Sequence, residues 1–420
     1  MFTEKPHQSI LFLGPQSCGK SSVAGQVVYK LGGVWNNKLE MIRQELMEIN
    51  QPDYLYARIM DQRRDEKKAC MTKYFSLYSC ETNVKSYSLI NVPGKLQYLK
   101  EILIGIALAD VVVFVLSGNR ESNLLYQSIY KLLLKLCFSK EIENLICVVH
   151  KMDEIQYSEQ IFNQNVDDFK QLLHDIGYNK QIPFIPTSIR MNQNIKEHHQ
   201  TTNWYNGLTL IEALDLQDIS KQEINGHLRM LVYGGHRIPG IGTIAVGKVC
   251  YGVLQQNSII QIAPDSINAE VGSIETHHYM CEQARQNQLI GVRLKNIQHK
   301  EIRNGQIITG DPSQSCLAFI AEIKVCQDFK HKIKKGHTYP LFLNTILMVC
   351  KIGAISDSNE SPIELVANQS GIVKFVSLKY IYVETYTDYP KLGCFAIISS
   401  QNVIAIGKIL EVIKKYDQKD

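Results

Sequence analysis

The sequence has no strong excess of charge of either sign. Its 420 residues carry 45 lysines and arginines and 41 acidic side chains, which gives a net charge of +4. A protein whose whole surface attracts nucleic acid or an anionic membrane carries a larger excess. The composition therefore gives no chain-wide electrostatic case for such partners and leaves open only a local basic patch.

Paired cysteines and a long apolar segment are also missing. The 11 cysteines are an odd number without a C-x-x-C pair, which predicts reduced thiols and neither a disulfide framework nor a zinc site. The longest apolar run, Ile102–Leu116, is interrupted by Asp110 and is shorter than the roughly 18 residues that a membrane span needs. The first residues, M-F-T-E-K-P-H-Q, show neither a signal peptide nor a transit peptide. We therefore expect a cytoplasmic protein without a membrane partner.

The first half of the chain alternates short apolar runs with helical segments. The apolar runs are Ser9–Leu13, Tyr87–Val92, Asp110–Leu116, Leu145–Val149 and Phe184–Pro186. Amphipathic or apolar stretches, such as Ser122–Phe138 and Gln160–Ile176, lie between them. Strands that alternate with helices predict a parallel sheet with helices on both faces.

The pattern changes after the segment Trp204–Asp215. From about Leu228 onward, short β-rich runs alternate with Gly, Asn and Pro turns, and a second set of such runs begins near Cys316. The clearest runs of the first set are Gly242–Val249, Ser258–Ala263, Ala269–Ile274 and Gly291–Leu294. Residues Gly310–Ser315 read as a linker. We therefore expect an α/β domain at residues 1–222, followed by two β-barrel domains at residues 223–312 and 313–420.

A phosphate-binding motif follows the first apolar run. Residues 14–21 read G-P-Q-S-C-G-K-S and fit the P-loop pattern G-x-x-x-x-G-K-[ST], between a strand and a helix-forming segment. Backbone N–H groups of such a loop surround phosphate oxygens, while Lys20 reaches the β- and γ-phosphates and the Ser21 hydroxyl binds Mg²⁺. An ordinary glycine-rich turn is the alternative. The predicted phosphate-binding residues are Gly14, Ser17, Cys18, Gly19, Lys20, Ser21 and Ser22.

A candidate base-binding motif lies directly after the strand Leu145–Val149. His150-Lys151-Met152-Asp153 stands where guanine-specific GTPases carry N-K-x-D. The Asp153 carboxylate can accept hydrogen bonds from guanine N1–H and its exocyclic amine, a pair that adenine does not offer. A solvated loop is the alternative interpretation of this motif alone. Thr187-Ser188-Ile189 resembles the last guanine loop, in which the backbone N–H groups of Ser188 and Ile189 would contact the base.

Two further segments are candidates for nucleotide-sensing switches. Asn91-Val92-Pro93-Gly94 occupies the place of D-x-P-G, so the Gly94 N–H would sense the γ-phosphate, while Asn91 replaces an aspartate that holds Mg²⁺ through water. Thr72 ends the charged segment Met60–Thr72 and falls where a Mg²⁺-coordinating threonine belongs. Without a family context, the charged segment would read as an exposed helix.

Taken together and in this order, the motifs resemble the elongation factor 1-alpha family, with its relatives the termination and ribosome-rescue GTPases. Further collinear matches span nearly the whole chain: Gly25–Gly33, Trp204–Asp215, Gly240–Val249, Glu275–His278, Thr385–Pro390 and Ala405–Leu410. The resemblance implies a cytoplasmic protein that binds GTP or GDP with Mg²⁺. It also implies partners: the ribosome, and a tRNA or a tRNA-shaped protein as cargo.

The resemblance implies a pocket for the tRNA 3′ end on the first barrel. Glu275 aligns with the residue near the terminal ribose and His277 with one near the aminoacyl group, although an ordinary barrel edge is an equal alternative. Leu289 stands where the family has an asparagine that contacts the amino acid. The stretch Phe395–Asn402 has no arginine, whereas the family presents arginines there to the tRNA stem. Weak tRNA binding is expected from these departures.

Other departures surround the γ-phosphate. Lys95 replaces the histidine that positions the attacking water in the family, Ser17 replaces a P-loop aspartate, and Gln16 replaces an apolar gate. Since phosphoryl transfer depends on positioning and charge stabilisation, these changes predict slow hydrolysis. Two hypotheses remain open: a translational GTPase with impaired turnover, and a non-catalytic paralogue that serves as a binding or scaffold module outside translation.

Overall fold

The computed structural model describes residues 5–218, 226–276, 279–312, 315–356 and 364–414. The chain forms two compact units, the first of residues 1–137 with 142–221 and the second of residues 138–141 with 222–420. Within the described ranges, no helix combines the length and the apolar character needed to cross a membrane.

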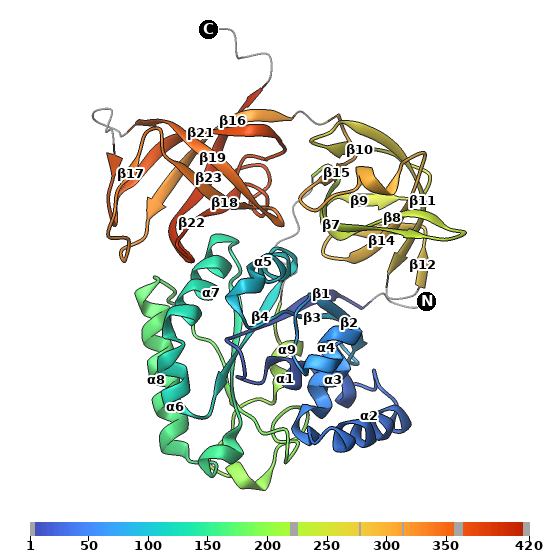
Figure 1. Ribbon diagram of the computed structural model, residues 1–420, viewed down its shortest axis with the longest axis vertical. Helices are drawn as coiled ribbons and strands as arrows, with labels where there is room; N and C mark the ends of the chain where they lie inside the picture. Colours follow the sequence, from blue (N-terminus) through green and yellow to red (C-terminus); the bar gives the residue numbers. More distant parts are fainter. Residues whose placement is uncertain (1–4, 219–225, 277–278, 313–314, 357–363, 415–420) are drawn as a thin grey trace. The chain divides into compact units, whose positions relative to one another are not determined.

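A six-stranded sheet forms the centre of the first unit (Figure 1). Its strands are β1 (His7–Leu13), β2 (Ser76–Glu81), β3 (Ser86–Asn91), β4 (Val111–Ser117), β5 (Asn144–His150) and β6 (Phe184–Pro186). The strand order is β2-β3-β1-β4-β5-β6. All neighbours are parallel except the edge strand β2, which pairs antiparallel with β3. The apolar runs predicted all five parallel strands, but they did not indicate β2, because polar residues interrupt the apolar ones in the short edge strand Ser76–Glu81.

Helices cover both faces of this sheet. They are α1 (Lys20–Lys30), α2 (Asn36–Glu48), α3 (Leu55–Met60), α4 (Arg64–Ala69), α5 (Leu99–Leu108), α6 (Arg120–Leu125), α7 (Gln127–Ser139), α8 (Glu159–Asp175) and α9 (Leu210–Asp215). Short 3-10 turns are η1 (Pro52–Tyr54), η2 (Leu96–Tyr98), η3 (Met152–Ile155) and η4 (Gln200–Thr202).

The two faces carry different helices. On one face, α1 and α9 bury Val27 and Leu214 in a cluster with alternate strand residues such as Val113. On the other face, Phe169 of α8 packs against Phe114 of β4, with ring centroids 5.5 Å apart. Because both faces are covered, the strands read as continuous apolar runs rather than alternating ones.

The first barrel of the second unit is built from antiparallel strands. They are β7 (Arg229–Ile238), β8 (Gly242–Tyr251), β10 (Ile259–Ala263), β11 (Ile267–Thr276), β12 (Tyr279–Cys281), β14 (Leu289–Lys295) and β15 (Ile307–Thr309), with the turn η6 (His299–Glu301). The short strands β9 (Val253–Gln255) and β13 (Gln283–Arg285) form a separate two-stranded sheet. The order β10-β15-β7-β8-β14-β11 closes on itself because β10 also pairs with β11. Inward-facing residues such as Val232, Val271 and Val292 form its core.

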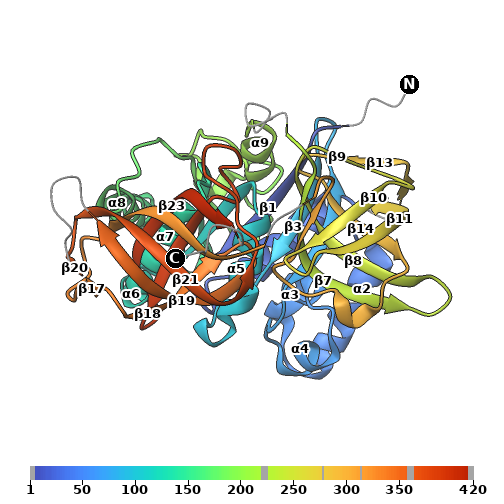
Figure 2. The same ribbon diagram turned by 90° about the horizontal axis from the view of Figure 1, so that it is seen from above.

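The second barrel is also closed, in the order β16-β21-β19-β18-β22-β23. The two-residue strands β17 (Ile333–Lys334) and β20 (Glu364–Leu365) form a separate sheet. The strands of the barrel are β16 (Cys316–Val325), β18 (Thr338–Leu343), β19 (Ile346–Ser356), β21 (Ser370–Ile381), β22 (Cys394–Ser399) and β23 (Asn402–Lys414). Figure 2 shows these long strands from above. The core contains three stacked or edge-on rings, Phe319, Phe375 and Phe395.

The predicted fold class, an α/β domain followed by two β-barrels, is therefore confirmed. The domain limits at residues 222 and 312 remain predictions, since residues 219–225 and 313–314 lie outside the described ranges.

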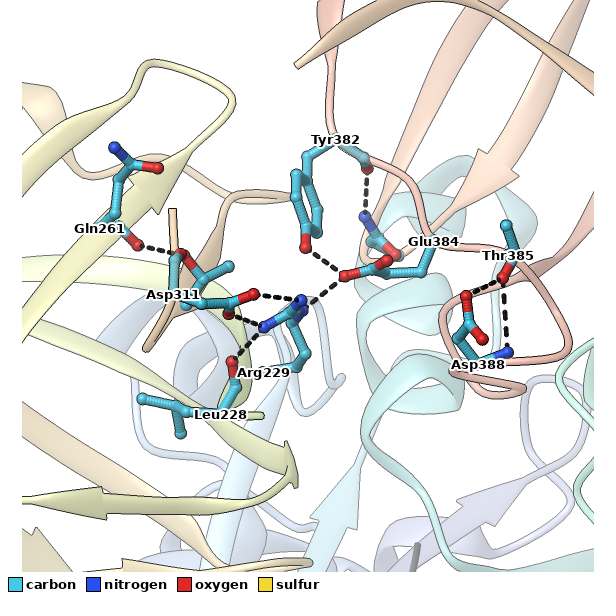
Figure 3. A network of polar contacts seen from close by, with 10 residues as sticks. Leu228, Arg229, Gln261, Asp311, Tyr382, Glu384, Thr385 and Asp388 are labelled. Carbon is cyan, nitrogen blue, oxygen red and sulfur yellow. Dashed lines mark hydrogen bonds and ion pairs between the residues drawn. The ribbon is translucent and has the colours of Figure 1, made fainter. Parts of the chain in front are cut away.

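A polar network joins the two barrels within the second unit (Figure 3). Arg229 at the start of β7 donates to Asp311 of the connecting segment and to Glu384, which follows β21. Tyr382 also donates to Glu384. Burial alone lowers the pKa of Arg229, but its hydrogen bonds to the two carboxylates outweigh burial and raise it. Arg229 therefore stays charged while it is buried.

Candidate nucleotide-binding site

The P-loop connects β1 to α1, as the motif predicted. Gly14 and Gly19 have φ angles of +151° and +101°. A Cβ atom at Gly14 would lie 2.6 Å from the carbonyl oxygen of Val115, and the N-terminus of α1 has no side-chain cap. The loop backbone is thus free to surround an anion at the helix N-terminus.

Lys20 points back over the loop. Its buried ammonium donates to the carbonyl oxygen of Pro15 at 2.8 Å, and burial lowers its pKa. Gly94, at the end of the candidate switch, lies against it, because a Cβ atom there would be 2.5 Å from Lys20 Nζ and 2.7 Å from the Gln16 nitrogen. The structure therefore brings Lys20 and Gly94 together, and only glycine fits this contact.

The predicted metal ligands form one cluster of oxygen atoms. Ser21 Oγ, in the first turn of α1, lies 2.9 Å from Thr72 Oγ1 and donates to Asn91 Oδ1 at 3.1 Å. Asn91 is fully buried at the end of β3, and its Nδ2 atom has no hydrogen-bond partner among the described residues. Thr72 and Asn91 follow Ser21 by 51 and 70 residues in the chain, so the fold brings the three side chains together.

Sequence reasoning did not assign a role to Asp61, although it lies in the charged segment before Thr72. Thr72 Oγ1 donates to Asp61 Oδ1 at 2.9 Å, and the Tyr54 hydroxyl of η1 donates to the other carboxylate oxygen. Burial raises the pKa of Asp61 to about 6. Asp61 therefore places a carboxylate beside the Thr72 hydroxyl, which itself lies 2.9 Å from Ser21 Oγ, whereas Asn91 supplies no carboxylate.

His150 packs against the P-loop from the base side. Its ring is buried, its Nδ1 atom lies 3.1 Å from Thr187 Oγ1, and its Cδ2 atom would be only 2.2 Å from a Cβ atom at Gly19. Burial, assisted by Lys151, lowers the pKa of His150 to about 3. The imidazole is therefore neutral near pH 7 and links the P-loop to the Thr187 loop.

Asp153 and Ser188 meet at the predicted base pocket. Ser188 Oγ donates to Asp153 Oδ1 at 2.6 Å, and Met152 N donates to the carbonyl oxygen of Thr187 at 3.2 Å. Lys151 adopts a left-handed φ of +64° and forms an ion pair with Glu154 at 3.0 Å. The two base motifs thus lie side by side, with the Asp153 carboxylate oriented by a hydroxyl group.

Gln26 is a second residue that sequence reasoning missed. It is buried in α1 and donates to the carbonyl oxygen of Ile189 at 3.5 Å and to Asn192 Oδ1 at 2.8 Å. Its only signal in the sequence is a polar side chain on an otherwise apolar helix face, which does not identify a partner 163 residues away.

Lys95 follows Gly94 and precedes η2. Its side chain is half-buried, and no hydrogen bond or ion pair joins it to another residue of the described ranges. The structure therefore places this amine next to the switch glycine without fixing its direction.

The candidate tRNA pocket is only partly described. Glu275 is exposed on β11, opposite Gly291 of β14, while His277 lies outside the described residues. Leu289, at the start of β14, is buried, with 5% of its surface exposed. In the second barrel, Phe395–Ile398 are buried, so only Ser399–Asn402 of the arginine-free stretch lie at or near the surface.

The arrangement as a whole defines a class of protein. A P-loop motif, a candidate base loop with a carboxylate and a candidate glycine switch lie on a doubly covered sheet, and two β-barrels follow, as in translational GTPases. The family models agree. Residues 5–220 match the elongation factor Tu GTP binding domain, residues 242–309 match elongation factor Tu domain 2, and residues 318–410 match the GTP-eEF1A C-terminal domain-like family.

The curated relatives narrow the class. The chain is 30% identical to elongation factor 1-alpha of Plasmodium falciparum, over 99% of this chain and 97% of that protein. It is 31% identical to elongation factor 1-alpha 2 of Euplotes crassus, over 99% and 98%. The chain belongs to the elongation factor 1-alpha family of translational GTPases, as a divergent member.

Solved structures share the fold. The S. cerevisiae Ski7 GTPase-like domain, bound to GDP and inorganic phosphate, superposes with a TM-score of 0.81 at 18% identity and covers 97% of each chain. A bacterial selenocysteine-specific elongation factor gives a TM-score of 0.71 at 17% identity, over 97% of this chain and 58% of that one.

Proposed function

We propose that this protein binds GTP or GDP with Mg²⁺ at the described site and acts in the cytoplasm as a carrier of a tRNA-shaped cargo to the ribosome, with slow GTP hydrolysis. The observation that carries the proposal is the contrast around Gly94. The phosphate and metal groups are assembled around Lys20 and Ser21, whereas Lys95 takes the place of a water-positioning histidine.

The residues present fit a magnesium ion. Mg²⁺ prefers oxygen ligands and commonly binds one or two carboxylates together with phosphate oxygens. Ser21 and Thr72 would contribute hydroxyls, and Asp61 and Asn91 would act from the next layer. When bound, the ion neutralises the charge that develops on the β- and γ-phosphate oxygens.

Slow hydrolysis follows from the changed side chains. A lysine ammonium has three donors and no acceptor, so Lys95 cannot take a proton from water as an imidazole can. Asn91 adds no charge to the metal site, and Ser17 replaces the carboxylate of the family's P-loop. Lys95 can instead pair with the γ-phosphate and favour the GTP-bound state.

Single-turnover measurements of GTP hydrolysis, with and without ribosomes, test the proposed slow hydrolysis. The variants are Lys95→His and the triple reversion Lys95→His, Asn91→Asp, Ser17→Asp. Because these groups act at one site, we expect a slow wild type, a small gain from the single change and a larger gain from the triple variant. A wild type that ribosomes stimulate to the rate of an ordinary elongation factor would refute slow hydrolysis.

Nucleotide binding itself is tested by Lys20→Ala. This change removes the cation of the P-loop and should weaken GTP and GDP binding at least tenfold. Equal affinity of the wild type for ATP and GTP would contradict the proposed base recognition.

The cargo is proposed to be other than ordinary aminoacyl-tRNA. Leu289 is buried rather than polar at the amino-acid position, and the exposed end of the arginine-free stretch, Ser399–Asn402, has no cation. Contact with ribosomal RNA nevertheless has support on the first barrel. A surface cavity of about 710 Å³ there is lined by four lysine and arginine side chains, Arg237, Arg293, Lys295 and Lys300, of which Lys295 pairs with Glu270.

Filter binding with aminoacyl-tRNA in the presence of a GTP analogue tests whether ordinary aminoacyl-tRNA is the cargo. We expect weak binding with a shallow salt dependence, because the stretch that would meet the tRNA stem offers no cation to its phosphates. Tight, strongly salt-dependent binding would contradict the proposal.

The second candidate is a non-catalytic binding or scaffold module outside translation. The concentration of changes at Ser17, Asn91 and Lys95 favours it. Co-sedimentation with ribosomes distinguishes the two functions, since a scaffold outside translation would not sediment with them in any nucleotide state.

A further inference from the structure

Arg190 lies between two carboxylates from distant parts of the first unit. Its Nε atom is 3.6 Å from Asp153 Oδ2, and its Nη2 atom donates to both carboxylate oxygens of Asp53 at 3.2 Å. The carboxylate of Asp53 and, more weakly, that of Asp153 hold the pKa of Arg190 above its ordinary value.

The loop that carries Arg190 is held at both of its ends. Ser188 and Gln193 form an antiparallel bridge, so residues 188–193 make a tight hairpin. Gln26 of α1 donates to the side chain of Asn192 in the same hairpin at 2.8 Å. Arg190 therefore stands at the tip of a fixed loop, next to the carboxylate that would recognise the base.

The other side of the contact leads to the metal cluster. Asp53 belongs to η1, and the next residue, Tyr54, donates its hydroxyl to Asp61. Asp61 accepts from Thr72, which lies 2.9 Å from Ser21. A three-residue turn thus connects the base loop on one side with the predicted Mg²⁺ ligands on the other.

We propose that the ion pairs of Arg190 with Asp153 and Asp53 form a latch that slows nucleotide release and couples the base pocket to the magnesium site. This inference rests on the proposed nucleotide binding and adds Arg190 and Asp53 as positioning residues. In this proposal nucleotide release separates the base loop from η1, and the Arg190–Asp53 hydrogen bonds oppose that movement. Arg190 also orients the Asp153 carboxylate together with the Ser188 hydroxyl.

The expected size of the effect on nucleotide release follows from the solvent exposure of the Arg190 and Asp53 side chains. The side chains of Arg190 and Asp53 are 66% and 78% exposed, so salt screens their pairing. Exposed pairs of this kind change an equilibrium or a rate by roughly twofold to fivefold. The latch is therefore a regulator of release and not the main source of affinity.

A double-mutant cycle on GDP release tests the latch in the full-length protein. The dissociation of fluorescently labelled GDP is followed in excess unlabelled GDP and Mg²⁺ for Arg190→Ala, Asp53→Ala and the double variant. We expect each single variant to release GDP roughly twofold to fivefold faster, and the double variant to be no faster than the faster single one. Arg43→Ala is the matched control, because it removes an exposed ion pair with Glu40 on α2 and should leave release unchanged.

Coupling to the metal site has its own readout. The Mg²⁺ concentration that half-maximally slows GDP release should rise a few-fold in Asp53→Ala, which leaves Asp61 and Thr72 intact. A role of Asp53 in stability alone would not move this concentration. Raising the salt to about 0.5 M should bring wild-type release close to that of Arg190→Ala and leave the double variant nearly unchanged.

The possible outcomes are distinct. Unchanged release in both single variants, or effects that multiply in the double variant, would overturn the latch while leaving the proposed nucleotide binding intact. A wild type that binds no GDP would overturn the proposed function and the latch together.

Discussion

At the scale of single residues, His150 is the clearest departure of the base site. An asparagine offers both a donor and an acceptor, whereas the neutral imidazole offers one of each on opposite sides of the ring. In the structure one of these sides faces Thr187 and the ring packs on Gly19. The histidine therefore keeps the mechanical link between the P-loop and the base loop, and it does so in the uncharged form.

His150 should make the first unit sensitive to acid. In the unfolded chain its pKa is about 6.5, and in the folded protein it is lowered to about 3. Between these pH values the unfolded state binds more protons than the folded state. The contribution of the neutral His150 to the free energy of unfolding is therefore fully present above about pH 6.5 and is lost as the pH falls towards 3. We expect the step from pH 7 to pH 5 to destabilise the wild type by about 2 kcal/mol more than His150→Asn.

Urea unfolding followed by tryptophan fluorescence measures this difference, because both tryptophans, Trp35 and Trp204, lie in the first unit. If the wild type and His150→Asn lose the same stability between pH 7 and pH 5, the imidazole is not held neutral by burial.

Asp153 carries the prediction for base selectivity. Its carboxylate accepts a hydrogen bond from Ser188, so Asp153→Asn keeps the shape of the pocket while replacing one acceptor oxygen by a donor. We expect guanine nucleotides to bind at least tenfold more weakly and xanthine nucleotides more tightly. Competition of GDP and XDP for labelled GDP checks this, and an unchanged preference would place the base elsewhere.

At the scale of an element, the segment after β3 lies very close to the P-loop. Gly94 lies so near Lys20 and Gln16 that a Cβ atom there would be 2.5 Å and 2.7 Å from their nitrogens. The segment can therefore rest on the P-loop only without a side chain, as the predicted γ-phosphate-sensing role of the Gly94 N–H requires.

Gly94→Ala should separate GTP binding from GDP binding. The added methyl group pushes the segment away from Lys20, so we expect GTP affinity to fall about tenfold or more and GDP affinity to change little. Gly291→Ala is the matched control, because its Cβ atom would meet only Ile244 at an ordinary 3.6 Å. Calorimetric titration with GDP and a non-hydrolysable GTP analogue measures both affinities, and equal losses for the two would show that Gly94 shapes the loop without sensing the γ-phosphate.

At the scale of the whole molecule, the second unit depends on charge between its two barrels. Figure 3 shows Arg229 between Asp311 and Glu384, and the Tyr389 ring lies 4.7 Å from its guanidinium. A buried arginine is favourable only while these partners remain, because removing one member leaves the others desolvated and unpaired.

Arg229→Ala should destabilise the second unit by about 3–5 kcal/mol. Lys295→Ala is the control, because it removes a half-exposed ion pair with Glu270 in the same unit. It should lower the free energy of unfolding by no more than about 1 kcal/mol. Hydrogen exchange of β7 and β21 measures the change locally, while tryptophan fluorescence should report an unchanged first unit. Equal protection in Arg229→Ala and in the wild type would mean that the barrels do not need this network.

The local motifs were predictable because their chemistry is set by neighbours in the chain. A P-loop needs two glycines, a lysine and a hydroxyl at fixed spacing between a strand and a helix, and residues 14–21 supply all of them. Likewise, the five parallel strands read as apolar runs because the sheet is buried on both faces. The edge strand β2 did not, because most of its side chains are only partly buried or exposed.

What only the tertiary structure decided is which distant side chains meet. In the sequence, Asp61 is one of several charges in a segment that would read as an exposed helix, whereas in the structure it is buried and accepts a hydrogen bond from Thr72. Gln26 and Arg190 contact partners more than 130 residues away. Hydrogen bonds and ion pairs act over a few ångströms in space and carry no fixed spacing along the chain. The sequence by itself therefore determined the family and the fold class and predicted the phosphate loop, while the folded chain determined which residues of the predicted base pocket, switch and metal cluster lie together.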